Sequence, residues 1–171
     1  FWLEFSSNSN ILSGNTANNN SIGFYLSSSI NNYIYQNDFE NNTYNNAYSD
    51  SSTNFWDSPS EITYVYNDNI YTSYLGNYWS DYTGSDANGD GIGDKPYSIT
   101  FGVQDNYPLM MPYVCGDCNH DGEVNMTDVD MIGDAWMCRE GELNYNNHLD
   151  FNMDGIINIK DATVIGLNWL K

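Results

Sequence analysis

Near its C-terminus the chain contains two copies of a twelve-residue pattern of oxygen-bearing side chains, D-x-N-x-D-G-x-x-N-x-x-D, over residues 117–128 and 150–161. Calcium takes six to eight oxygen ligands, and a loop of this length supplies them from positions 1, 3, 5, 7, 9 and 12. Gly122 and Gly155 occupy position 6, where the sharp turn favours a residue that tolerates a positive φ. Because the two copies agree at every side-chain position of the pattern, the sequence predicts two calcium-binding loops.

The predicted ligands include the backbone carbonyl of position 7 in each loop. They are Asp117, Asn119, Asp121, Glu123, Asn125 and Asp128 in the first loop, and Asp150, Asn152, Asp154, Ile156, Asn158 and Asp161 in the second.

Apolar residues follow each loop at spacings i, i+3 and i+7, which predicts an amphipathic helix after each. These residues are Val129, Ile132 and Trp136 in the first copy, and Ala162, Ile165 and Trp169 in the second. An apolar stripe of this kind is usually core. We therefore expect all six side chains to be interior and the two helices to pack on each other.

Residues 113–171, which carry both loops and both following segments, resemble a dockerin, a module that binds a cohesin domain. Position 12 is Asp in both loops, as in dockerins, where an ordinary EF-hand has Glu. The resemblance implies that loop positions 10 and 11 contact the cohesin. These are Met126 and Thr127 in the first copy and Ile159 and Lys160 in the second. Since the copies differ there, we expect one preferred binding orientation.

The charge balance restricts the partners. The chain has 4 basic and 23 acidic residues and a formal net charge of −19. Nucleic acid is excluded as a partner, because phosphate contacts need Lys and Arg. No apolar run approaches the length of a membrane span, so no membrane insertion is expected. We expect a piece of a longer extracellular protein, secreted or attached to the cell surface.

Covalent modification is expected at two kinds of residue. Glycosylation sequons at Asn19 and Asn41 are predicted acceptors, whereas the sequon at Asn125 falls on a calcium ligand. An odd cysteine count in a secreted protein predicts one disulfide and one free thiol, with Cys138 paired to either Cys115 or Cys118. The alternative is a zinc site made by these three cysteines and His120.

A second repeat lies in the N-terminal part, where a shift of 22 residues superposes residues 12–20 on residues 34–42. Repeats of this length are typical of solenoids. Short apolar alternations separated by Asn pairs predict strands and turns. Asn tolerates left-handed corners, and stacked Asn side chains form hydrogen-bonded ladders. The alternative is an unstructured Asn-rich tract, against which the aromatic content of 16% argues.

The pattern resembles the right-handed parallel β-helix of NosD-like proteins. The expected fold is therefore the C-terminal part of an all-β right-handed parallel β-helix over residues 1–112, followed by a small all-α dockerin over residues 113–171. A third calcium-type loop, over residues 86–94, is expected to pin the C-terminal cap of the β-helix. Its predicted ligands are Asp86, Asn88, Asp90, the Ile92 carbonyl and Asp94, and the alternative is a plain Gly/Asp turn.

These features predict a calcium-dependent assembly protein, in which the dockerin binds a cohesin and the β-helix is cargo or a structural rod. Two alternatives stay open: a self-assembling filament or surface-layer subunit that binds a neighbouring copy, and the non-catalytic end of a polysaccharide-active β-helix enzyme. Passive glycan binding is also open. Residues 1–94 contain no Lys, Arg or His. The carboxylates of Glu4, Asp38 and Glu40 are the nominal catalytic candidates there, and we expect no enzyme activity in this chain.

Overall fold

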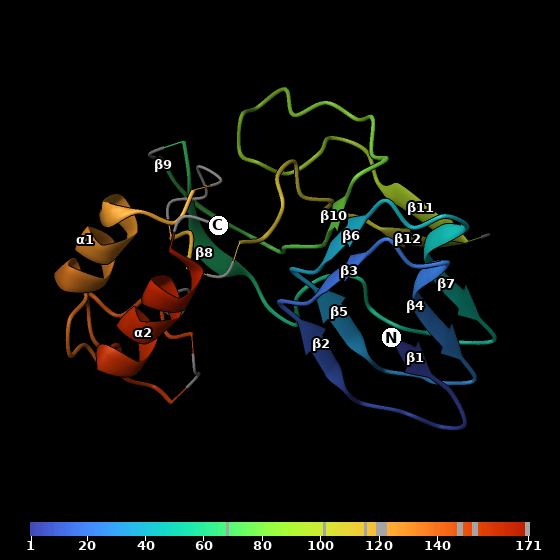
Figure 1. The fold of residues 1–171 in the computed structure, drawn as a ribbon, viewed down its shortest axis with the longest axis horizontal. Helices are drawn as coiled ribbons and strands as arrows, with labels where there is room; N and C mark the ends of the chain where they lie inside the picture. The colour runs from blue at the N-terminus through green and yellow to red at the C-terminus, as the bar shows by residue number, and fades with distance from the viewer. Residues whose placement is uncertain are drawn as a thin grey trace. The chain divides into compact units, whose positions relative to one another are not determined.

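A computed structural model describes residues 1–67, 69–100, 102–114, 116–118, 123–146, 149–151 and 154–169 of the chain. The structure is mostly β, with two short α-helices near the C-terminus (Figure 1). Two compact units are present. The first comprises Phe1–Glu61 and Tyr74–Tyr113, and the second comprises Ile62–Ser73 and Val114–Lys171. Among the described residues no helix is long and apolar enough to cross a membrane.

Short parallel strands build the first unit. One sheet has the order β1 (Trp2–Leu3), β4 (Ile22–Ser27), β7 (Asn45–Asp50). A second has the order β3 (Thr16–Asn18), β6 (Asp38–Glu40), β10 (Tyr78–Trp79). A third pairs β2 (Ile11–Ser13) with β5 (Tyr33–Tyr35). An antiparallel pair, β11 (Tyr97–Thr100) and β12 (Val103–Asp105), completes the unit.

The strand register follows the sequence repeat. Leu12 lies opposite Ile34 and Thr16 opposite Asp38, which are steps of 22 residues. In the β1–β4–β7 sheet the step is 23 residues, as between Trp2 and Tyr25. The prediction that the 22-residue repeat sets the stacking is confirmed for the β2–β5 and β3–β6 pairs. The Asn-rich region forms paired strands, so the alternative of an unstructured tract is wrong.

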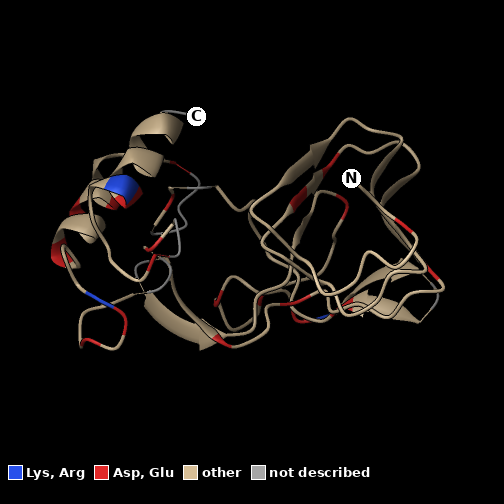
Figure 2. Ribbon diagram, turned by 90° about the horizontal axis from the view of Figure 1, so that it is seen from below, with Lys and Arg blue, Asp and Glu red and all other residues tan. Residues whose placement is uncertain are grey.

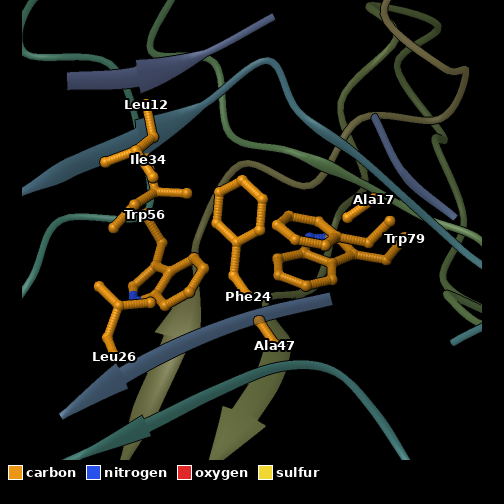
Figure 3. Close-up of a cluster of buried hydrophobic side chains, with 9 residues drawn as sticks. Leu12, Ala17, Phe24, Leu26, Ile34, Ala47, Trp56 and Trp79 are labelled. Atoms are coloured by element: carbon orange, nitrogen blue, oxygen red, sulfur yellow. The ribbon is translucent and has the colours of Figure 1, made fainter. Parts of the chain in front are cut away.

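Aromatic rings pack against one another inside the first unit, from one strand to the next (Figure 3). The rings of Phe24 and Phe39 lie 4.8 Å apart, edge to face. Phe39 stacks on Trp79 at 4.4 Å, and Trp79 stacks on Tyr97 at 4.1 Å. The buried residues of this core are Leu12, Ala17, Phe24, Leu26, Ile34, Phe39, Ala47, Trp56 and Trp79. Large rings contribute most of the buried apolar area, so this column is the main stabilising element of the unit.

Asparagine side chains form the hydrogen-bonded ladders that the sequence predicts. Asn15 Nδ2 donates to Asn37 Oδ1, and Asn37 Nδ2 donates to Asn77 Oδ1, each at 2.9 Å. A parallel ladder runs through Asn10, Asn32 and Asn54. At the corners, Asn19 and Asn41 adopt left-handed φ angles of 57° and 51°. Asn is used in both places because its amide replaces backbone partners that a corner leaves unsatisfied.

Replacing Asn37 with Ala tests the ladder. Asn37 is fully buried and its Nδ2 also donates to the carbonyls of Leu12 and Tyr35. We expect Asn37→Ala to lower the free energy of unfolding by about 2–4 kcal/mol, because buried donors and acceptors lose their partners. Urea denaturation measures this change. Asn18→Ala, at an exposed position, is the matched control, and an equal effect of the two substitutions would contradict a stabilising ladder.

An antiparallel hairpin interrupts the repeat. It consists of β8 (Ile62–Tyr66) and β9 (Asn69–Ser73). The hairpin begins and ends at almost the same point of the parallel strands. The hydrogen bond that Ser58 N donates to Leu75 O, at 2.9 Å, shows this. This insertion lengthens the ladder step from 22 residues to 40 between Asn37 and Asn77. The sequence analysis did not predict the hairpin.

The second unit contains helices α1 (Met126–Asp134) and α2 (Ile159–Asn168). Ile132 and Ile165 are buried in one cluster, which confirms that the helices pack on each other. The buried members are Cys118, Val124, Ile132, Ala135, Leu149, Ile157 and Ile165. The prediction that Trp136 and Trp169 belong to this core is wrong, because both are exposed. The helices end before these residues, so helical spacing does not bring them to the apolar face.

Candidate metal-binding and docking site

Each predicted loop ends in the N-terminal cap of a helix. Asn125 Oδ1 accepts a hydrogen bond from Thr127 N at 2.9 Å, and Asp128 Oδ2 accepts one from Asn125 N at 2.8 Å. Asn158 and Asp161 make the same pair of bonds at the start of α2. This is a capping box. Loop positions 9 and 12 therefore also start the helices, a role that the sequence analysis missed although the N-x-x-D spacing signals it.

The second loop folds around the carboxylate of its first position. Asp150 Oδ1 accepts from Asp154 N at 3.1 Å, and Asp150 Oδ2 accepts from Gly155 N at 2.8 Å. Gly155 has a φ of +79°, as predicted for position 6. The Tyr145 hydroxyl also donates to Asp150 Oδ2, at 2.7 Å. Burial and this hydrogen bond to Asp150 raise the pKa of Tyr145, so the phenol stays protonated and orients the carboxylate.

Four loop carboxylates are withdrawn from solvent, with exposed fractions between 0% and 4%: Asp117, Asp128, Asp150 and Asp161. Acidic residues outnumber basic ones along the chain (Figure 2), and Lys160 Nζ forms an ion pair with Asp154. Burying carboxylates is costly unless they are paired or coordinate a metal. An all-oxygen donor set of this charge fits calcium, which carries a double positive charge and prefers oxygen.

Part of each dockerin loop lies outside the described residues. The predicted ligands Asn119 and Asp121 of the first loop and Asn152 of the second lie outside the described residues, as does Gly122. Over the ranges that the structure describes, no three His, Cys, Asp or Glu side chains gather as a metal-holding group. Glu123, whose carbonyl is a predicted ligand, is exposed.

Loop 86–94 has the hydrogen-bond pattern of the second loop. Asp86 Oδ1 accepts from Asp90 N at 3.1 Å and Asp86 Oδ2 accepts from Gly91 N at 2.8 Å, which are the same loop positions as at Asp150. Asp90 Oδ1 accepts from Ile92 N at 2.8 Å. Positions 1, 5, 6 and 7 are thus arranged alike in the two loops.

The far end of this loop is arranged differently. Asp94 Oδ2 accepts from Ser85 Oγ at 2.9 Å and from Ala87 N at 3.0 Å. Asn88 Nδ2 donates to Asp90 Oδ2 at 2.8 Å. The structure therefore does not bring Asp86, Asp90 and Asp94 into one metal-holding cluster.

The residues predicted to bind a partner are on the surface. Met126 and Ile159 have exposed fractions of 62% and 66%, and Thr127 and Lys160 are also exposed. Two exposed tryptophans, Trp136 and Trp169, follow the helices at equivalent positions of the repeat. Exposed apolar side chains at repeated positions are typical of an interaction surface.

The cysteine and sequon predictions stay predictions. Cys118 is buried in the core of the second unit and Cys138 is half-buried, and neither is in a disulfide among the described residues. Cys115 and His120, needed for the alternative pairing and for zinc, lie outside the described residues. Asn19 and Asn41 are exposed, so an oligosaccharide has access to both.

A buried carboxylate ends the asparagine ladder of the first unit. Asp105 Oδ2 accepts from Asn77 N, from Asn77 Nδ2 and from the Trp79 indole, and its Oδ1 accepts from Tyr107 N. Complete burial raises the pKa of Asp105 to about 7, although the four donors act in the opposite direction. Sequence reasoning missed this residue, because nothing in the local pattern distinguishes it from a surface Asp.

Asp38, one of the nominal catalytic candidates, is also held by the fold. Its Oδ1 accepts a hydrogen bond from Tyr113 N at 2.6 Å. Burial raises the pKa of Asp38 to about 7, and the nearby Glu40 adds to the rise. Glu40 Oε2 accepts from Asn18 Nδ2 at 3.1 Å. Both carboxylates thus have structural partners.

The raised pKa values predict a pH dependence of the first unit. Between about pH 4 and about pH 7 the folded unit holds protons on Asp38 and Asp105 that the unfolded chain has released, since the ordinary value is 3.8. Their contribution to the free energy of unfolding therefore falls as the pH rises through this window and is constant above it. Asn carries no charge at any pH. We expect Asp38→Asn to gain stability over the parent by on the order of 2 kcal/mol between about pH 5 and pH 8.

Urea denaturation of both proteins at the two pH values measures this difference. A constant difference between Asp38→Asn and the parent would show that Asp38 ionises normally in the folded protein.

Two family models match the chain. The NosD family, described as periplasmic copper-binding protein, matches residues 1–84, and the dockerin type I domain matches residues 115–166. No curated protein and no solved structure matches the chain significantly. Copper does not fit the N-terminal region, because residues 1–84 contain no His, Cys or Met, the side chains that copper sites use. The chain joins a NosD-like region, over residues 1–84, to a dockerin type I domain, over residues 115–166.

Proposed function

We propose that this chain is an extracellular assembly protein whose dockerin binds a cohesin domain in a calcium-dependent manner. The observation that carries the proposal is the dockerin match over residues 115–166, together with the exposure of the residues at loop positions 10 and 11. Met126 and Ile159 supply apolar contact area, and Lys160 supplies a charge that the first copy lacks. One orientation on the partner is therefore favoured.

Calcium in the two dockerin loops holds this surface in shape. Asp117, Asn119, Asp121, Asn125 and Asp128 hold one ion, with the Glu123 carbonyl, and their counterparts in residues 150–161 hold the other. Calcium supplies charge neutralisation to the buried carboxylates and performs no chemistry. Asn125 and Asp128 also cap α1, so ion binding and helix formation are coupled through the same residues.

The first unit is proposed to be the end of a right-handed parallel β-helix that serves as cargo or rod. The NosD match and the parallel strands in 22-residue steps support this. Residues 86–94 are proposed to hold a third ion, on the strength of the hydrogen-bond pattern shared with residues 150–156. No catalytic role is assigned to the unit, since Asp38 and Glu40 already serve the fold.

Binding to a type I cohesin domain tests the docking function. We expect surface plasmon resonance to show binding in millimolar calcium and its loss in excess chelator. Ile159→Asp should weaken binding by about 10-fold or more, because it places a charge in the contact. Ile11→Asp, at an exposed apolar position of the first unit, is the matched control and should have no effect.

A different outcome would favour the filament alternative. If type I cohesins fail to bind while the protein forms larger species as its concentration rises, the chain assembles with itself. Size-exclusion chromatography over a concentration series distinguishes the two cases. Calorimetry in the same buffers counts the ions: three supports the loop at 86–94, and two reduces it to a turn.

A further inference from the structure

The β8–β9 hairpin buries a residue that the hairpin cannot cover by itself. Tyr64 is only 3% exposed, and its ring lies 5.8 Å from the ring of Tyr71 on the neighbouring strand. A two-stranded ribbon is one layer thick, so a ring on either face needs a second layer to exclude water. Something other than the two strands therefore covers the Tyr64 face.

The opposite face of the hairpin is open. Ile70 is 75% exposed, and Thr63 and Thr72, whose hydroxyls lie 2.9 Å apart, are exposed as well. On the covered face, Ile62, Tyr66, Tyr71 and Ser73 are all at least half-buried, like Tyr64. The alternation holds over Ile62–Tyr64 and Ile70–Ser73, whereas near the turn Val65 is half-buried and Asn69 is exposed. Away from the turn, the ribbon therefore has one buried face and one solvent face.

The stack of parallel strands does not need the hairpin. Ser58 N donates to Leu75 O, and Leu75 N donates to Ser58 Oγ at 3.2 Å. The residues on either side of the hairpin are therefore joined to each other without it. Residues 62–73 instead form one compact unit with residues 114–171. The C-terminal segment is therefore the candidate for the second layer over the Tyr64 face.

We propose that the hairpin Ile62–Ser73 is part of the docking module: its Tyr64 face packs against residues 114–171. The module then consists of two segments that are distant in sequence. The chain passes between the two units three times, after residues 61, 73 and 113, rather than once. An isolated segment 114–171 lacks one layer of its packing. This inference concerns how the module is built and holds whether or not the module binds a cohesin.

Helix unfolding tests the proposal in the full chain. Both helices of the described residues lie in the second unit, so the helical signal in circular dichroism at 222 nm reports chiefly on that unit. We expect Tyr64→Ala to lower the midpoint of this transition by about 10 °C or more in calcium, because a buried ring is lost from a small unit. Ile70→Ala, on the open face of the same hairpin, should shift it by no more than about 2 °C. Equal shifts for the two variants would overturn the proposal.

A cleavage experiment tests the packing without a destabilising substitution. A protease recognition sequence is inserted between Tyr113 and Val114, and the folded protein is cut in calcium. We expect the fragments to stay together in size-exclusion chromatography, because the hairpin remains packed on the C-terminal segment. They should separate when residues 59–74 are replaced by a short Gly-Ser linker. Separation in the protein that keeps its hairpin, or persistence of the complex without it, would overturn the proposal.

Discussion

Asp105→Ala is expected to lower the free energy of unfolding of the first unit by about 3–5 kcal/mol. Four donors end on this carboxylate, two of them from Asn77, one from Trp79 and one from Tyr107. Removing the acceptor takes the carboxylate partner from Asn77 N, Trp79 Nε1 and Tyr107 N, whereas Asn77 Nδ2 keeps the carbonyls of Ile34 and Trp56. Buried polar groups without partners are costly. The loss is large for a domain whose total stability is on the order of 10 kcal/mol.

Two further variants distinguish the cause. Asp105→Asn keeps one oxygen for Asn77 and Trp79 but turns an amide donor toward Tyr107 N, so an intermediate loss is expected. Gln104→Ala, at an exposed position of the same strand, should have little effect. Urea denaturation followed by near-ultraviolet circular dichroism, which reports Trp79, measures all three. If Asp105→Ala were no worse than Gln104→Ala, the ladder would not depend on its terminal carboxylate.

Asp161→Asn is expected to remove calcium from the second loop and to weaken α2. Asp161 is fully buried and combines two roles, since it is the predicted ligand at position 12 and caps the helix through Asn158 N. The substituted amide oxygen still accepts the capping hydrogen bond, so the variant isolates the loss of charge. We expect at least about a 10-fold loss of affinity for one ion and a lower midpoint of helix unfolding.

The control is Asp130→Asn, which makes the same change at an exposed helix position outside the loops. Calcium titration by calorimetry and circular dichroism at 222 nm are the two measurements. Asp128→Asn should likewise weaken calcium binding by the first loop and lower the midpoint of helix unfolding. An unchanged ion count in both variants would show that position 12 is a cap and not a ligand.

Periodic features of the sequence predicted their structural counterparts well. The repeat of 22 residues predicted the register of the β2–β5 and β3–β6 pairs, and the asparagines at matching positions form ladders. The two calcium-type patterns, 33 residues apart, predicted a helix after each loop, and both helices are present. Repetition is informative because equivalent residues must have equivalent neighbours in a stacked or duplicated fold.

Helix length was not predictable in the same way. The spacing of Trp136 after Ile132 fits a helical stripe, but α1 ends at Asp134 and the tryptophan is exposed. Where a short helix stops depends on how its last turn is capped and packed, which tertiary contacts decide. An apolar residue just beyond the end then belongs to the surface, as Trp136 does.

The sequence by itself determined the local structures: the helix that follows each loop, the step of the repeat in two strand pairs, and the turns at Asn19 and Asn41. Each of these depends on residues within one repeat. Only the tertiary structure decided that Asp105 ends a ladder begun at Asn15, and that the hairpin carrying Tyr64 belongs with residues 114–171. Both involve residues far apart in the chain, and the burial that gives them their energy exists only after the chain has folded.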